Sequence, residues 1–365
     1  MRIVGLFLLA AWCAECAWGG FTPAGYPMVL LFLAPLYGGA ALLIREAGRR
    51  AGAGWPGLAL LAAAFGLVQA GLVDQSLFDP AALAGTEFAD AGRQATATTV
   101  PALGFSAEQL FTFVGGHVWL SICAPIALVE ACVHPERRHT PWLGPAGITV
   151  TALAYTAASL VIFSDSGAVA GRGQIGFVVV VAVALIAVAL LRPRRWRPFA
   201  GHPSPRPRPG PRPRPRPRRG GAVTSPPGEG VPVLWVGGVV AAGHLAGWFF
   251  PASWTGLALR VLTVAVVVAL MLRWVSSTAH ALAAWSAGVL VAAAGAWLTP
   301  PYQAASPAMM LAGDIVTTLV AVGVVTFAFR RLRSRSYLPR TTYAECAPSS
   351  TNAPPTKQKG SNDHP

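Results

Sequence analysis

A segment of alternating proline and arginine separates two series of apolar runs in this chain. Residues 205–219 read PRPRPGPRPRPRPRR, within a longer tract at 192–230. Proline lacks a backbone donor and fixes φ, so this pattern excludes a helix or a central strand. The remaining conformation is extended, solvated polyproline II, a rod of roughly 45 Å at about 3.1 Å per residue. The tract therefore lies outside any membrane and divides the chain.

The same tract holds most of the net charge of the protein. It contains eleven arginines, whereas the whole chain has a net charge of +14, so the rest is nearly neutral. We expect a cytoplasmic tether that lies on anionic lipid headgroups, at roughly 1 kcal/mol for each basic residue near the surface. The predicted lipid contacts are Arg206, Arg208, Arg212, Arg214, Arg216, Arg218 and Arg219. The alternative is a docking segment for an acidic partner, a proline-binding module or nucleic acid. Few aromatic residues interrupt the tract, which argues against nucleic acid.

Composition places the chain among membrane proteins. Hydrophobic residues make up 54% and charged residues 12% of the sequence, and the mean hydropathy is +0.52. Soluble domains carry about 25% charged residues. We therefore predict an all-α, multi-pass membrane protein whose main partner is the lipid bilayer, with a membrane protein as a further candidate partner. Arginine is frequent and lysine scarce, which suggests a GC-rich bacterial genome and the bacterial plasma membrane.

The apolar runs predict about ten transmembrane helices, because a span needs about 20 mainly apolar residues. They lie near residues 3–17, 26–44, 55–77, 109–132, 143–163, 175–191, 233–250, 256–272, 279–298 and 308–329. The first run resembles a signal peptide in length, but Glu15 and Trp12 stand where small cleavage-site residues belong, so we expect it to be retained. The predicted organisation is a six-helix region at 1–191, a disordered linker at 192–231, a four-helix region at 232–331 and a disordered tail at 332–365.

The charges of the loops fix the expected orientation. Basic groups follow alternate runs: REAGRR at 45–50, HPERRH at 134–139, the arginine tract, Arg273 and RRLRSR at 330–335. The other loops hold Arg93 and Arg172 as their only basic residues, among several acidic ones. By the positive-inside rule, both termini are predicted to be cytoplasmic.

The cysteines do not suggest a disulfide framework. Cys13, Cys16, Cys123 and Cys132 lie in or beside apolar runs, and Cys346 lies in the polar tail. We interpret the first four as small core residues, and we treat the CxxC spacing of Cys13 and Cys16 within an apolar run as weak evidence for redox or metal chemistry.

Ionisable and amide side chains inside the apolar runs are the candidate functional residues, because such groups are costly at membrane depth. They are Glu15, Gln69, His117, Glu130, His244, Arg260, His280 and Asp314. We expect Glu130, Arg260 and His280 to snorkel or cap near an interface, and Glu15 to end a short first helix. His117 shares a helix face with Phe113 and Ser121, and Asp314 shares one with Thr317 and Thr318. For each residue the simplest interpretation is a hydrogen bond between helices.

Two functional patterns remain open for these residues. Asp314, His244 and Glu15 are candidates for a proton or cation path. His117 and His244 are candidate ligands of zinc or another divalent metal, although no spacing pattern supports the site and no cofactor is predicted.

Two short stretches resemble a known family. The run FGLVQAGLVDQSLFDP at 65–80 and the run FVGGHVW at 113–119 are similar to the first two motifs of the CAAX-processing-like intramembrane proteases. Phe113 and His117 match the family's Phe-x-x-x-His, and His244 stands as its later histidine. However, Gln69, Ala70 and Asp74 replace its two glutamates and its arginine. Since Gln cannot act as a general base, the resemblance implies a degenerate member without protease activity, in which Gln69, His117 and His244 mark the former catalytic positions.

Three functions follow as hypotheses. The first is a non-enzymatic membrane scaffold with a degenerate protease-like region. The second is a proton- or cation-coupled transporter. The third is a metal-dependent intramembrane enzyme that uses His117 and His244.

Overall fold

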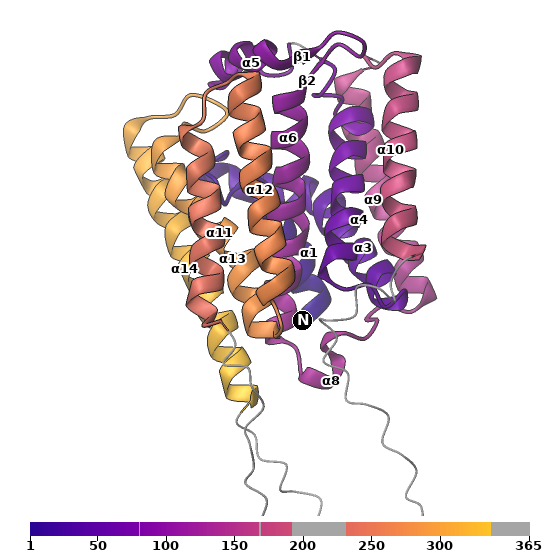
Figure 1. Ribbon diagram of the computed structural model, residues 1–365, viewed down its shortest axis with the longest axis vertical. Coiled ribbons are helices and arrows are strands. Elements are labelled where there is room, and N and C mark those ends of the chain that lie inside the picture. The colour runs from indigo at the N-terminus through magenta and orange to yellow at the C-terminus, as the bar shows by residue number, and fades with distance from the viewer. Residues whose placement is uncertain (80, 168, 192–230, 337–365) are drawn as a thin grey trace, which may run out of the picture.

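The computed structural model describes residues 1–79, 81–167, 169–191 and 231–336, and this part of the chain is 78% helical. The helices form one upright bundle (Figure 1). The predicted fold class, an all-α membrane protein, is thereby confirmed. The lipid-contacting arginines at 206–219, Cys346 and most of the tail lie outside the described residues.

The first region contains two series of helices, and a short outer layer lies between them in the order of the chain. Its elements before that layer are α1 (Arg2–Glu15), η1 (Pro23–Gly25), α2 (Tyr26–Phe32), η2 (Ala34–Gly38), α3 (Gly39–Arg50), α4 (Trp55–Val68) and η3 (Gln69–Val73). Those after it are α6 (Ala107–Gly116), η5 (His117–Cys123), α7 (Ala124–Cys132), α8 (Pro135–Arg138), α9 (Pro145–Ser166) and α10 (Arg172–Leu191). As predicted, the short first helix ends at Glu15.

The second region follows the arginine tract. Its elements are α11 (Val233–Ala246), η7 (Gly247–Phe249), α12 (Trp254–Trp274), α13 (Thr278–Gly295), η8 (Ala296–Leu298) and α14 (Pro307–Ser336). Local sequence explains where several helices begin. The hydroxyls of Ser106, Ser253 and Ser277 accept N-capping hydrogen bonds at α6, α12 and α13. Proline stands in the first turn of α4 and α9, where its missing N–H costs nothing.

Among the described residues, seven helices are long and apolar enough to span a membrane. They are Trp55–Val73, Ala107–Cys132, Pro145–Ser166, Arg172–Leu191, Trp254–Trp274, Thr278–Leu298 and Pro307–Arg335. An eighth candidate is the pair Pro23–Phe32 and Ala34–Arg50, which is bent by 53°. Pro35 lies at this break, where it removes a helical hydrogen bond and forces the chain to bend. The run at 26–44, predicted as one span, is therefore bent at this break.

A thin outer layer covers one end of the bundle (Figure 1). It contains α5 (Ala89–Ala95), η4 (Thr96–Thr98) and a two-stranded antiparallel hairpin of β1 (Thr99–Val100) and β2 (Phe105–Ser106). The register pairs Thr99 with Ser106 and Val100 with Phe105. The hydroxyl of Thr98 lies 3.0 Å from that of Ser106, which fixes the hairpin to the start of α6.

The core lies around α1, α7 and α13. Leu6, Ala10 and Cys13 of α1 have no exposed surface, and α1 packs against η2, η5 and α7. By contrast, α9, α10 and α12 expose many large apolar side chains, as expected of helices that face lipid. Cys13, Cys16 and Cys123 are free and buried, and Cys132 is free and partly buried, which confirms their prediction as core residues rather than disulfide partners.

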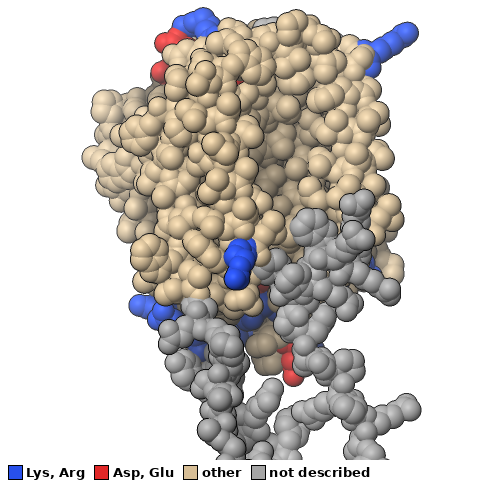
Figure 2. Space-filling view, viewed as in Figure 1, with Lys and Arg blue, Asp and Glu red and all other residues tan. Residues whose placement is uncertain are grey.

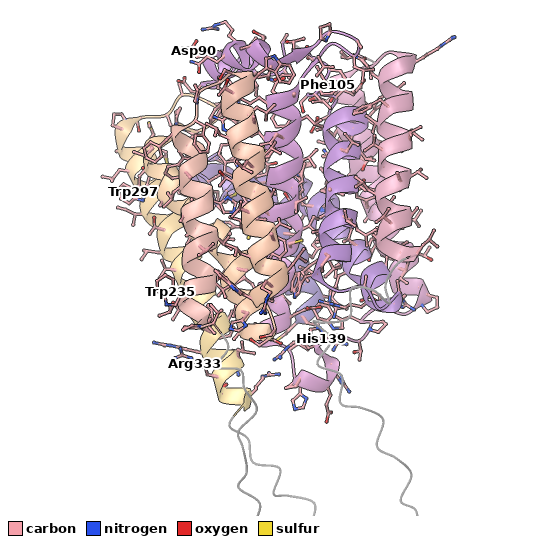
Figure 3. All side chains as sticks on the ribbon, viewed as in Figure 1. Asp90, Phe105, His139, Trp235, Trp297 and Arg333 are labelled. Carbon is pink, nitrogen blue, oxygen red and sulfur yellow. The ribbon has the colours of Figure 1, made fainter. Side chains whose placement is uncertain are left out.

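Charged side chains visible on one face gather toward the two ends of the bundle (Figure 2). Arg333 and His139 lie at one end and Asp90 at the other (Figure 3). The middle of this face therefore shows no charged side chains, which suits contact with a bilayer.

Candidate functional site

An apolar pocket of about 1050 Å³ lies between the two helical regions. α4, α6, η5 and α10 of the first region line one side, and α11, α12 and α13 of the second region line the other. The surface is visibly hollowed along this boundary in the space-filling view (Figure 2). Most of its walls are helices that are long and apolar enough to span a membrane.

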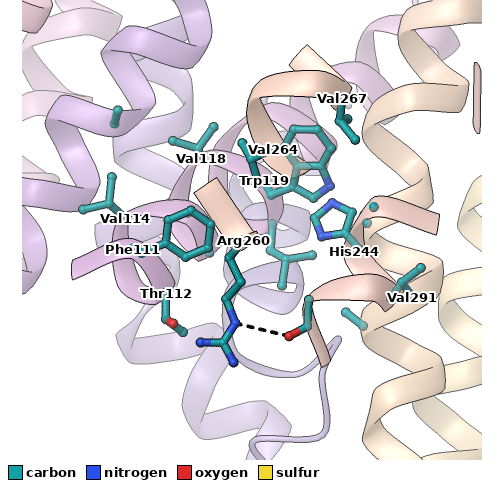
Figure 4. Close-up of a pocket in the computed structure, with 18 of the residues that line it drawn as sticks. Phe111, Thr112, Val114, Val118, Trp119, His244, Arg260, Val264, Val267 and Val291 are labelled. Atoms are coloured by element: carbon teal, nitrogen blue, oxygen red, sulfur yellow. Dashed lines mark hydrogen bonds between the residues drawn. The ribbon is translucent and has the colours of Figure 1, made fainter. Parts of the chain in front are cut away.

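Three ring side chains form a polar spot in this apolar wall. Trp119 of η5 lies against His244 of α11, with ring centroids 4.7 Å apart, and against Trp285 of α13 at 4.4 Å. Figure 4 shows Trp119 and His244 side by side at the cavity. The Nε1 atoms of both tryptophans are buried and have no hydrogen-bond partner among the described residues. Both indole N–H groups thus lack an acceptor, and because neither nitrogen has accessible surface, a molecule in the pocket does not reach them.

A glycine makes this arrangement of rings sterically feasible. A Cβ atom at Gly288 would lie 2.0 Å from Cδ1 and 2.1 Å from Nε1 of Trp119. No other residue therefore allows Trp119 to lie so close to α13.

Arg260 occupies the opposite end of the pocket. Its guanidinium donates to the Gly247 carbonyl at 3.2 Å and to the Phe250 carbonyl at 2.5 Å. It also pairs with Glu108 of α6 at 2.5 Å. Figure 4 shows Arg260 below Trp119, with its bond to a carbonyl of the adjoining segment. The expected capping role of Arg260 is confirmed, and its ion pair ties the second region to the first.

The pocket is large enough for a mostly apolar molecule. Its lining is mainly apolar, and the His244 imidazole can bind one polar group. The ion pair of Arg260 and Glu108 leaves one end polar but neutral.

A second polar cluster lies inside the first region, where π-helical segments of three helices meet. These segments are η2, η3 and η5, which hold Tyr37, Gln69 and His117. π-Helical turns are rare and frequently occur at functional sites. The Tyr37 ring lies 5.8 Å from the His117 ring, and Phe65 lies 5.3 Å from His117. Nδ1 of His117 lies 3.2 Å from the Ser121 hydroxyl, so the predicted shared face is confirmed.

Two carboxylates complete this cluster. The Tyr37 hydroxyl donates to Oε1 of Glu15 at 2.5 Å. Gln69, which is 1% exposed, donates from Nε2 to Oδ2 of Asp74 at 3.4 Å. The Oε1 atom of Gln69 is buried without a hydrogen-bond partner among the described residues.

The third polar group is an ion network at the end of the bundle where α3, α7 and α8 meet. Glu130 is 1% exposed and binds Arg45 at 3.0 Å and Arg49 at 2.6 Å. Arg45 has no exposed surface, and its guanidinium lies 3.3 Å from the centre of the Trp142 ring. Glu130 therefore does not snorkel to the interface, as the sequence suggested, because two buried guanidinium groups neutralise it in place.

Burial affects two groups next to this network. It lowers the pKa of Arg138 from its ordinary value, and the Glu130 carboxylate partly opposes the shift. It lowers the pKa of His139 to about 4, with Glu130 opposing and Arg49, Arg138 and Arg45 reinforcing the shift. His139 is thus neutral at physiological pH, so it adds no charge to the network of Glu130, Arg45 and Arg49.

The structure does not bring the two candidate metal ligands into one site. His117 lies between Tyr37, Phe65 and Ser121, whereas His244 lies against Trp119. Among the described residues, no group of three or more His, Cys, Asp and Glu side chains could hold a metal ion. The metal-enzyme hypothesis therefore gains no support from the geometry.

The three residues of the suggested transport path also have separate surroundings. His244 lines the pocket, and Glu15 belongs to the cluster with Tyr37. Asp314 lies on α14, partly buried, near Tyr26, whose hydroxyl lies 2.7 Å from that of Thr317. His280 has a structural role at the start of α13, where its N–H is capped by Ser277 and its Nε2 lies 2.9 Å from the Val231 carbonyl.

Sequence reasoning missed Tyr37, Trp119, Trp285 and Arg45. The aromatic residues occur within apolar runs, where a ring is usually a core residue, and Arg45 occurs in a run that indicates a cytoplasmic loop. Only the proline two residues before Tyr37 signalled an irregular helix there.

Comparisons of the chain with protein-family models, with curated proteins and with solved structures found no match.

Proposed function

We propose that this protein is a non-enzymatic membrane protein that binds a lipid-like molecule in the pocket between its two helical regions. The observation that carries the proposal is the 1050 Å³ apolar cavity, lined from both regions by helices long enough to span a membrane. A large, mostly apolar concavity with a few convergent polar groups is the usual form of a ligand site.

The proposed ligand is an amphiphile with a long hydrocarbon part and at least one hydrogen-bond acceptor, such as an ester or carbonyl oxygen. The imidazole of His244, which is partly exposed and lines the pocket beside Trp119, would bind the acceptor. A hydrocarbon chain would then lie against the small and branched side chains of α4, α6 and α12. Bound in this way, the ligand would join the two regions and act as part of the scaffold.

The proposal includes ten membrane crossings. To the seven long helices and the bent pair it adds α1, which is 14 residues long, and the shorter apolar segment Val233–Phe249. Arg333 and His139 lie at the end opposite Asp90, which supports cytoplasmic termini in a bacterial plasma membrane. The arginine tract would then lie on anionic headgroups of the cytoplasmic leaflet.

The lack of catalysis is also part of the proposal. Gln69 stands where the family that the sequence resembles carries a glutamate, and an amide cannot take up a proton from water. α4 and η5 pack together, and a Cβ at Gly66 would lie 2.9 Å from that of His117, so the two motif-bearing segments are neighbours. This adjacency supports a degenerate protease-like region that has kept its packing.

The experiment fills the pocket with side chains. Ala63 of α4 and Ala292 of α13 line the cavity, so Ala63→Phe and Ala292→Phe place a ring inside it. Protein purified in a mild detergent is extracted with organic solvent, and the lipids are identified and counted by mass spectrometry. We expect about one tightly held molecule per wild-type chain and a several-fold loss in each variant.

The matched control is Ala157→Phe, which adds the same ring at an exposed position of α9 outside the pocket. It should retain lipid as the wild type does. Equal retention by the two pocket variants would refute the proposal, as would a wild-type protein without bound lipid.

A further inference from the structure

The apolar pocket between the two helical regions contains one side chain with a permanent charge. Among the described residues that line it, Arg260 of α12 is the one arginine, and lysine, aspartate and glutamate do not occur there. The other polar lining consists of His244, tryptophans and threonines. The charge that a bound molecule meets is therefore set by Arg260 and by the group that neutralises it.

Glu108 of α6 neutralises this arginine. Its Oε1 lies 2.5 Å from Nη1 of Arg260, and the side chains of Arg260 and Glu108 are 16% and 14% exposed. Oε2 of Glu108 is buried without a hydrogen-bond partner among the described residues. Glu108 is not one of the residues that line the pocket. The pocket therefore presents a guanidinium whose charge is balanced by a carboxylate outside the lining.

The guanidinium keeps hydrogen-bonding capacity for a ligand. Nε of Arg260 donates to the Gly247 carbonyl at 3.2 Å, and Nη2 donates to the Phe250 carbonyl at 2.5 Å. Nη1 donates to Glu108. A guanidinium has more N–H groups than these contacts use, so one N–H on each Nη nitrogen stays free. An oxygen of a lipid head group can accept from these groups, while the ion pair as a whole contributes no net charge.

The ion pair lies beside the place where the pocket opens toward the bilayer. Glu108 belongs to the first turn of α6, directly after strand β2 of the outer layer. Thr112 of α6 and Val264 of α12 lie one helical turn beyond Glu108 and Arg260, and both line the pocket and are exposed. Figure 4 shows Arg260 and Thr112 at the same end of the cavity. A lipid that enters between α6 and α12 thus brings its head group to the ion pair and its chains to the apolar lining.

We propose that Glu108 determines the head-group specificity of the pocket, so that lipids without net charge, such as phosphatidylcholine, bind in preference to anionic lipids, such as phosphatidylglycerol. This specificity rests on the proposed lipid binding and names the class of its ligand. An anionic head group at Arg260 also faces the Glu108 carboxylate, and it leaves a surplus negative charge in a poorly hydrated site. A head group without net charge accepts hydrogen bonds from the guanidinium and leaves the charges balanced.

A single substitution inverts the charge of the site. Glu108→Gln keeps the shape of the side chain and an oxygen that can accept from Arg260, but it removes the negative charge. Arg260 then becomes an unpaired cation, which an anionic head group neutralises. The share of phosphatidylglycerol in the pocket should therefore rise several-fold. The double variant Glu108→Gln, Arg260→Gln has neither charge, so it should lose this rise.

The test is a competition between two lipids with identical acyl chains. The full-length protein is equilibrated in mixed micelles with equal amounts of phosphatidylcholine and phosphatidylglycerol, separated from free lipid and analysed by mass spectrometry. Each protein is also made with Ala292→Phe, which fills the pocket. The lipid that is lost with Ala292→Phe is the pocket lipid, and lipid bound by the arginine tract is thereby subtracted. Glu87→Gln, which removes an exposed carboxylate of the outer layer, is the control and should keep the wild-type ratio.

We expect mostly phosphatidylcholine in the wild-type pocket and a several-fold larger share of phosphatidylglycerol in Glu108→Gln alone. An equal or larger share of phosphatidylglycerol in the wild-type pocket would overturn the specificity, and this result does not depend on how any ion-pair variant folds. A Glu108→Gln protein with the wild-type ratio would overturn it as well, as would a double variant that keeps the rise. If Ala292→Phe removes no lipid from the wild type, the proposed lipid binding itself fails, so the two failures are distinguishable.

Discussion

Arg49 of α3 binds the carboxylate of Glu130 of α7 at two points, with Nε to Oε1 at 2.9 Å and Nη2 to Oε2 at 2.6 Å. The two residues are 81 positions apart, and Glu130 is 1% exposed. A two-point contact between a guanidinium group and a carboxylate fixes the relative orientation of the two side chains as well as the distance between them. This pair therefore sets how the second and fourth expected spans meet at one end of the bundle.

Glu130→Gln should destabilise the fold by roughly 3–5 kcal/mol, because Arg45 and Arg49 lose the charge that neutralises them in a buried site. Unfolding of the detergent-purified protein by a denaturing detergent measures the change. Glu136→Gln is the matched control, since its side chain is 87% exposed, and it should change stability little. Equal stability of the two variants would contradict a structural role for the network.

The stability of the protein should fall as the pH drops from about 6.5 toward 4. In the folded protein burial lowers the pKa of His139 to about 4, whereas an unfolded chain has a value near 6.5. Between these values the unfolded chain binds a proton that the folded chain does not, so acid favours unfolding. Because 48% of the side chain is exposed, solvent screening keeps the effect small.

The measurement compares Tm at pH 7 and pH 5. His139→Gln should reduce the difference, whereas His134→Gln in the same loop, with 54% of its side chain exposed, should not. An unchanged difference in the His139 variant would show that this imidazole is not the responsible group.

Gly288→Ala should disturb both stability and lipid retention. The new methyl group would lie 2.0 Å from Cδ1 of Trp119, so the ring or α13 must move. Overpacking of this kind costs about 1–3 kcal/mol. Gly238→Ala on α11 is the control, because a Cβ there meets nothing within 4 Å. A Gly288 variant with wild-type stability and lipid content would contradict the close packing of Trp119.

His244→Phe should weaken lipid binding by about 2- to 10-fold, which corresponds to the ~0.5–1.5 kcal/mol of one hydrogen bond. The substitution keeps a ring in the pocket wall but removes its two nitrogens. His134→Phe is the control, because this histidine lies outside the pocket and 54% of its side chain is exposed. Retained lipid per chain, counted by mass spectrometry, should fall only in the His244 variant.

The class of fold was predictable because apolar run length and loop charge act locally along the chain. The same reasoning placed the end of α1 at Glu15 and the cysteines in the core. It did not detect that the run containing Pro35 is broken, since a proline within an apolar run is compatible with either a kink or a straight helix.

The candidate site was mostly not predictable. His244 and Trp119 were 125 positions apart in sequence before the fold placed their rings 4.7 Å from each other. Trp119 can lie against α13 only because Gly288 has no side chain, and no periodicity in the sequence encodes such a relation between helices. Similarly, the sequence indicated that Glu130 lies near an interface, but it does not show that Arg45 and Arg49 meet its carboxylate there.

The most direct test of lipid binding is photo-crosslinking in nanodiscs of phosphatidylcholine that carries a diazirine on one acyl chain. Trp119 and His244 line the pocket, and both are partly exposed. Val150 and Leu153 of α9 are 67% and 65% exposed and report ordinary lipid contact. The predicted result is labelling of Trp119 or His244 together with α9, and loss of the labelling at Trp119 and His244 alone in Ala292→Phe. Labelling of α9 alone would contradict an acyl chain in the pocket.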